Sequence, residues 1–168
     1  MPRLLAHIAI ALTTSGWIGG ASLHAQDPAD EVLFAAARDL TGPERDNRIG
    51  IDPREVKRVQ FPGSGVYVGL RARERTRALA ERLGGQVVSR DTAVRCDPGP
   101  PQCTLGNFDV VVALSEPVIS GDTATVHATV SSVYGPKADR VGTRDVVLTL
   151  IRSGSGWRVL AERITRIT

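Results

Sequence analysis

The last third of the sequence carries four apolar runs that are separated by polar turns. Within each run, apolar and polar side chains tend to alternate, so that one face of a strand would be buried and the other would face water. An antiparallel sheet with one dry face and one wet face has this pattern. The sequence therefore predicts an antiparallel sheet of four to five strands. The four runs cover residues 107–116, 123–133, 143–152 and 157–167.

Two turn sequences and a change in the phase of the apolar–polar alternation predict the hairpin turns and a β-bulge of this sheet. Residues 121–122 read Gly-Asp and residues 153–156 read Ser-Gly-Ser-Gly, and both are typical of hairpin turns. In the last run, the apolar positions alternate over residues 157–161 and then shift phase to Ile164. This shift predicts a β-bulge near Glu162.

A helix is predicted to begin at Asp27. The Asp27 side chain can accept hydrogen bonds from the first helical amides, and Pro28 suits the first turn because its missing N–H has no helical partner. Residues 41–43, Thr-Gly-Pro, would end the helix. We expect this helix to cover the dry face of the sheet. Its apolar stripe consists of Val32, Leu33, Ala36, Ala37 and Leu40.

The middle of the chain is more irregular. A second, short helix is predicted over residues 73–83, because glycines follow at 84–85 and its charged residues fall on one side, which we expect to face water. Residues 49–51 and 86–90 predict two short strands, the latter at an edge of the sheet. Residues 53–70 allow no assignment. The predicted fold class is α+β, with the sheet packed on the N-terminal helix.

Residues 1–25 resemble an export signal. Arg3 is the only charged residue among them, an apolar stretch follows over residues 4–12, and Ala25 is suitable as the last residue before cleavage. The apolar stretch is shorter than the roughly 20 residues that a membrane-spanning helix needs. We expect residues 26–168 to form a single domain with no membrane span, located outside the cytoplasm in the periplasm or beyond.

Cys96 and Cys103 are the only cysteines in the chain. Cysteines of exported proteins are usually paired, and the proline- and glycine-rich segment over residues 97–102 favours a turn that brings the two sulfurs together. We expect a structural disulfide. The alternatives are two free thiols or a redox-active pair, although redox-active pairs usually have two intervening residues.

The positive net charge does not indicate a nucleic-acid partner. Without Arg3 the chain has 18 arginines and two lysines, and most of them are interspersed with aspartate and glutamate. A nucleic-acid-binding protein would gather positive charge on one face and add exposed aromatic residues. We therefore expect no nucleic-acid binding.

One family resemblance follows from the turns of the predicted sheet. The C-terminal part of the chain resembles the C-terminal half of the nuclear-transport-factor-like, or cystatin-like, α+β superfamily. The resemblance lies in residues 115–124, Ser-Glu-Pro-Val-Ile-Ser-Gly-Asp-Thr-Ala, in the long strand that follows, and in residues 156–159, Gly-Trp-Arg-Val. The resemblance implies a curved antiparallel sheet around an N-terminal helix. Enzymatic members usually have several helices before the sheet, whereas this sequence predicts one helix, an irregular segment and a second helix.

No residue is assigned to catalysis, to a cofactor or to a metal. His127 is the only histidine after residue 25, and we expect it at the surface among threonines. Tyr67 and Tyr134 are the tyrosines that an isomerase of the resembled superfamily would need, but no motif links them to an acid. A pair of carboxylates could also meet across the sheet and act as a general base. These carboxylates would come from Asp109, Glu116, Asp145 and Glu162.

Three functions remain open at this level, and the third, besides the two that follow, is a structural or stress-related envelope protein with no ligand. The first is a non-catalytic exported domain that binds a protein partner or a small apolar ligand in the cell envelope. The second is a small cofactor-independent enzyme of the isomerase or dehydratase type on the same fold. A deep apolar cavity with a buried carboxylate on the concave face of the sheet would favour the enzyme, and a filled concave face would favour the binding domain.

Overall fold

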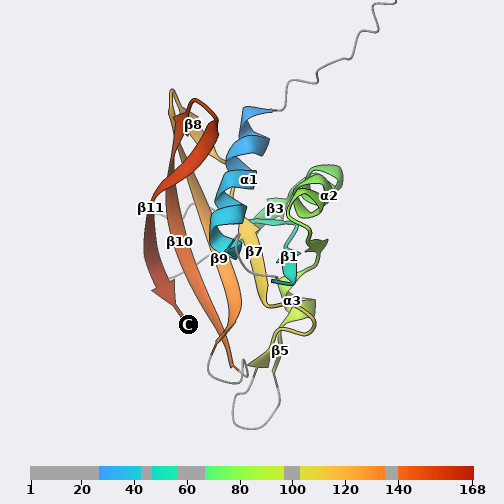
Figure 1. Ribbon diagram of the computed structural model, residues 1–168. Coiled ribbons are helices and arrows are strands. Elements are labelled where there is room, and N and C mark those ends of the chain that lie inside the picture. The colour runs from blue at the N-terminus through green and yellow to red at the C-terminus, as the bar shows by residue number, and fades with distance from the viewer. Residues whose placement is uncertain (1–26, 43–46, 57–66, 97–102, 135–139) are drawn as a thin grey trace, which may run out of the picture.

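The computed structural model describes residues 27–42, 47–56, 67–96, 103–134 and 140–168 (Figure 1). Its main feature is a mixed seven-stranded sheet with one helix, α1, packed along one face. A second helix, α2, contacts α1 and the strands at one end of the sheet. The helices are α1 (Pro28–Thr41), α2 (Arg73–Arg82) and α3 (Arg90–Ala93).

The strands of the large sheet follow the order β11-β10-β9-β7-β1-β4, and β8 also pairs with β9. Two small two-stranded sheets, β2–β3 and β5–β6, lie outside it. The strands of the large sheet are β1 (Ile49–Ile51), β4 (Gln86–Val87), β7 (Val110–Leu114), β8 (Val118–Ser120), β9 (Thr123–Tyr134), β10 (Arg140–Ser153) and β11 (Gly156–Ile167). The remaining strands are β2 (Arg54–Val56), β3 (Tyr67–Leu70), β5 (Arg95–Cys96) and β6 (Cys103–Thr104).

The sheet is mixed, and the prediction of a purely antiparallel sheet of four to five strands is wrong in this respect. β1 pairs in parallel with both β4 and β7, whereas β7 to β11 pair antiparallel. The parallel pair β1–β4 is made possible by the crossover through α2. A close approach also shapes this end of the sheet, because a Cβ atom on Gly50 would lie 2.5 Å from Cγ1 of Val88.

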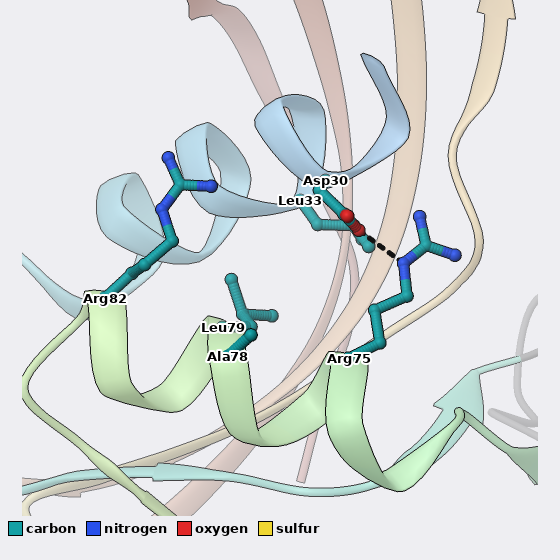
Figure 2. A pocket seen from close by; sticks show the side chains of 6 residues that line it. All are labelled: Asp30, Leu33, Arg75, Ala78, Leu79 and Arg82. Atoms are coloured by element: carbon teal, nitrogen blue, oxygen red, sulfur yellow. Dashed lines mark hydrogen bonds and ion pairs between the residues drawn. The ribbon is translucent and has the colours of Figure 1, made fainter. Parts of the chain in front are cut away.

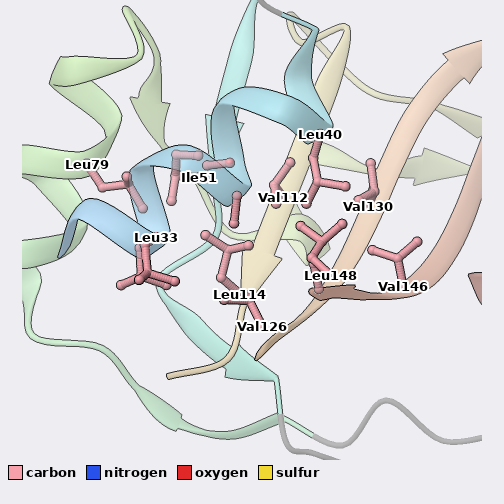
Figure 3. Packing of buried hydrophobic residues seen from close by; sticks show 14 of the residues in the cluster. Leu33, Leu40, Ile51, Leu79, Val112, Leu114, Val126, Val130, Val146 and Leu148 are labelled. Atoms are coloured by element: carbon pink, nitrogen blue, oxygen red, sulfur yellow. The ribbon is translucent and has the colours of Figure 1, made fainter. Parts of the chain in front are cut away.

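The apolar stripe of α1 forms the main core with the face of the sheet that we call the inner face (Figure 3). Val32, Leu33, Ala36 and Ala37 are at most 1% exposed. They pack against inner-face residues of β7, β9 and β10, which confirms the helix as the cover of this face. The inner-face residues are Val110, Val112, Leu114, Ala124, Val126, Ala128, Val130, Val146, Leu148 and Leu150.

The predicted start of α1 is also confirmed, since Oδ1 of Asp27 accepts a hydrogen bond from the amide of Ala29 at 2.9 Å. α2 begins and ends within one residue of its predicted bounds. Most of its charged residues are exposed as expected, and Thr76, Leu79 and Ala80 are buried.

The opposite face of the sheet, which we call the outer face, is not exposed to solvent along its whole length. β7 is buried on both faces, because Val111 packs in a second small cluster with Ala93 of α3 and with Leu105. Beside this cluster, the Arg90 guanidinium donates a hydrogen bond to the Ser131 hydroxyl at 2.8 Å. α3 and the segment around residue 105 therefore cover the outer face at this end, which the alternation within the run did not reveal.

The C-terminal hairpins follow the predicted turns. β8 and β9 are joined through Gly121, which has a positive φ of 57°, and β10 and β11 through residues 154–155. The ladder between β10 and β11 has two register shifts, which place Leu160 and Thr165 as the extra residues. The predicted single bulge near Glu162 is thus replaced by one bulge on each side of it.

The disulfide between Cys96 and Cys103 is present and joins β5 to β6. Within residues 53–70, which the sequence left unassigned, β2 and β3 form a small hairpin, while residues 57–66 lie outside the described residues. The proposed export signal over residues 1–25 also lies outside them. Among the helices of the described chain, none has the length and apolar character to cross a membrane.

Candidate binding surfaces beside the first helix

Two hollows flank α1, one on each side. The first has a volume of about 120 Å³ and lies between α1 and α2 (Figure 2). Leu33 and Leu79 form its apolar part, and Arg75 and Arg82 stand at its two ends. The hollow combines an apolar floor with two guanidinium groups, but carboxylates already engage both arginines, since Nη2 of Arg82 lies 3.0 Å from Oε1 of Glu31.

Arg75 has more carboxylate partners than Arg82. Its Nε donates a hydrogen bond to Asp30, and its Nη1 donates one to Oε2 of Glu116 at 3.1 Å. Partial burial disfavours the charged form of Arg75, but the hydrogen bond to Asp30 and the charges of Glu116, Asp30 and Asp27 outweigh it and raise its pKa. Arg75 therefore links α1 and α2 to the end of β7, which is a structural role and not that of a ligand-binding residue.

Arg71 extends the same network into the protein interior. Its side chain is only 1% exposed, and its Nε lies 3.3 Å from Oε1 of Glu116. Nη2 donates hydrogen bonds to the carbonyl oxygens of Leu114 at 3.0 Å and Ser115 at 3.2 Å. Burial lowers the pKa of Arg71, and the charge of Glu116 opposes that shift. Arg71 thus satisfies the backbone where β7 ends, which is a structural role.

The second hollow is a groove between α1 and the turn that joins β10 to β11. It has a volume of about 370 Å³. The half-buried side chains of Phe34, Ala35, Trp157 and Val159 form its apolar floor. Charged residues surround this floor, namely Glu31, Arg38, Asp39 and Arg158.

Two arginines hold the aromatic rings of the groove. The guanidinium carbon of Arg82 lies 4.0 Å from the ring centre of Phe34, and that of Arg152 lies 5.0 Å from the ring centre of Trp157. Cation–π contacts at exposed sites contribute about 0.5–1 kcal/mol, so these two favour the observed ring positions. The groove is therefore an apolar, aromatic and preformed surface.

The four carboxylates proposed from the sequence do not form a pair, because each has its own partner. Asp109 accepts hydrogen bonds from the guanidinium of Arg48, which lower the pKa of its carboxyl group. Asp145 accepts a hydrogen bond from the Thr129 hydroxyl at 2.7 Å. Glu116 binds Arg71 and Arg75, and Glu162 lies 3.5 Å from Arg144.

The remaining candidates are also separated. His127 lies half-buried on the outer face of β9, and its backbone amide donates a hydrogen bond to the Ser115 hydroxyl at 2.9 Å. Tyr134 is exposed at the end of β9, and Tyr67 begins β3. Neither His127 nor Tyr134 lines either of the two hollows beside α1.

Sequence reasoning missed one fully buried carboxylate, Asp52. Its oxygens accept hydrogen bonds from Nε and Nη2 of Arg54 at 2.9 and 2.5 Å, and from the amide of Arg90 at 2.7 Å. Asp52 is followed by a proline, which suggested only the end of a strand. Its partners surround it completely, and it lines neither hollow.

No three potential metal-ligating side chains lie together within the part of the chain that the structure describes. Comparison with protein-family models, with curated proteins and with solved structures gives no match for this chain. The geometry of the molecule is therefore the basis on which a function can be proposed.

The two network arginines should differ strongly in their effect on stability. Replacing Arg71 with alanine should lower the free energy of unfolding by about 2–3 kcal/mol, because it leaves the buried carbonyls of Leu114 and Ser115 without this donor. Arg75→Ala should cost about 1 kcal/mol or less, since that guanidinium is partly exposed.

Urea unfolding of the two variants measures this difference, and the exposed Arg77→Ala on the same helix is the matched control, expected to lie within about 0.5 kcal/mol of the unaltered protein. Equal losses for Arg71→Ala and Arg75→Ala would refute the structural role of Arg71.

Proposed function

We propose that this chain is an exported, non-catalytic α+β domain that binds an apolar group in the groove between α1 and the β10–β11 turn. The bound group is a small apolar ligand or an apolar side chain of a protein partner. The observation that carries the proposal is that α1 fills the inner face of the sheet. The apolar surface left for binding is therefore at the rim of that core, where Phe34 and Trp157 lie.

The enzymatic alternative has less support. An isomerase or dehydratase needs a carboxylate inside an apolar pocket, where its pKa can be tuned for proton transfer. The one fully buried carboxylate among the described residues, Asp52, is neutralised by Arg54 and lines neither hollow. This carboxylate is better explained as part of the framework that holds β1 and α3 together.

The groove has the features of a binding pocket for an apolar anchor. Aromatic rings provide large contact areas at a low cost in conformational entropy, and anchors of protein interfaces commonly insert into such pockets. The charged side chains at its rim would orient a ligand without filling the floor. The resemblance to the nuclear-transport-factor-like superfamily is also a proposal, and it is supported by the packing of α1 on a sheet of long antiparallel strands.

The extracytoplasmic location is supported by the disulfide, since such bonds persist in oxidising compartments. The mass of the protein recovered from outside the cytoplasm tests the proposal. We expect a chain that begins near Gln26, as cleavage after Ala25 requires. A protein that retains Met1 would contradict the export signal.

A charge placed on the floor of the groove should weaken binding of an apolar probe. We expect the dye 8-anilinonaphthalene-1-sulfonate to bind the folded protein saturably and to take up excitation energy from Trp157, which lines the groove. Ala35→Glu should weaken this binding by roughly tenfold or more, because a carboxylate would be buried under the dye and would repel its sulfonate.

The matched control is Ala161→Glu, which places the same charge at an exposed position of β11 outside the groove. Dye fluorescence, followed in titrations of the three proteins, gives the affinities. Non-saturable dye binding, or equal effects of the two substitutions, would argue against the groove as the binding site.

A further inference from the structure

The last strand of the sheet, β11, has an open edge. β11 is a long strand at the end of the strand order, and within the described residues it pairs only with β10. Edges of this length are usually shortened, covered or protected by charges, because their unpaired N–H and C=O groups can pair with another chain. Every residue from 161 to 168 is exposed.

Exposed apolar side chains lie along this strand. Leu160 is 57% exposed, Ile164 48% and Ile167 73%. Ile164 lies opposite Val146 and Ile167 opposite Arg144, so that both are on the inner face of the sheet. The C-terminal part of β11 extends past the end of α1 (Figure 1), which explains why the helix does not cover them.

The outer face of the same strand is basic. Arg158 lies opposite Ile151, Arg163 opposite Val147, and Arg166 opposite Asp145. The acidic residue of the strand, Glu162, is on the inner face and lies 3.5 Å from Arg144. β11 therefore offers apolar contacts on one face and a column of arginines on the other.

These charges select the kind of strand that can be added. A second copy of β11 in antiparallel pairing would bring its own arginines next to those of the first copy, and like charges on neighbouring strands destabilise the pair. A strand that carries acidic residues at alternate positions would place them beside the arginines. Its intervening apolar residues would then pack beside Ile164 and Ile167.

We propose that the edge of β11 binds an extended segment of a partner protein in which acidic and apolar residues alternate, by addition of a strand to the sheet. In this mode of recognition, backbone hydrogen bonds provide affinity, and side chains at alternate positions provide specificity. The part of β11 that the test follows, residues 161–167, does not line the groove beside α1, so that the two proposals are tested by different residues.

A labelled peptide of about eight residues with alternating glutamate and valine is a suitable probe. We expect it to bind the protein in fluorescence anisotropy titrations, more weakly as salt is added, and we expect a peptide of alternating lysine and valine not to bind. Arg163→Glu should weaken binding by roughly tenfold or more, because the new charge would repel the peptide. Arg140→Glu, which makes the same change at an exposed residue of β10, should have little effect.

Amide hydrogen exchange separates strand addition from simple charge attraction. On binding the acidic peptide, backbone amides of residues 161–167 should gain protection, whereas those of the groove should not change. Binding without this protection would overturn the proposal, and so would equal losses in Arg163→Glu and Arg140→Glu, or no binding at all. A protein that dimerises through β11 in sedimentation, and dimerises more strongly with Arg163→Glu, would show that a second copy is the occupant instead.

Discussion

The structure depends above all on the burial of one stripe of α1 against the inner face of the sheet. Val32, Leu33 and Leu40 are at most 7% exposed, and complete burial of a side chain of this size contributes about 1.5–3 kcal/mol. The alanines between them let the helix approach the strands closely. Since these contacts reach β7, β9 and β10 at once, the helix fixes the position of all three strands.

This burial also decides where the protein can act. A sheet of similar curvature without its helix would have an open concave face, whereas in this protein that face is filled. Among the described residues, the groove beside Trp157 and the long edge of β11 differ in chemistry, and in the hollow between α1 and α2 both arginines are held by carboxylates. The groove is aromatic with a mixed rim, and the edge combines a basic face with exposed isoleucines. We propose that both serve the recognition of other molecules.

Long elements could be predicted from the sequence because their periodicity is sustained. The stripe of α1 and the alternation in β9 and β10 each extend over many residues, so that the buried face can be identified without a structure. β1 and β4 have three and two residues, which is too short for a period, and their parallel pairing is imposed by the crossover through α2. The position of β7 is predictable, but its burial on both faces depends on residues far away in the sequence, Ala93 and Leu105.

The buried charged residues, Arg71 and Asp52, were the hardest part of the structure to predict from the sequence. Arg71 and Asp52 look like surface residues in the sequence, since each lies beside a segment with no clear pattern. Their burial is compensated by partners distant in the chain, such as Glu116 for Arg71 and the amide of Arg90 for Asp52. Among the groove residues, Trp157 is half-buried and packs against the main core.

Native-state hydrogen exchange of α1 tests the central claim most directly. If the helix is an integral part of the core, amides of residues 32–40 should exchange only through global unfolding, with the same opening free energy as residues 126–130 of β9. Exchange of the α1 amides through a local opening of much lower free energy would show that the helix is a loosely held cover. The inner face would then be accessible to ligands, which would contradict the central role of α1 in the core.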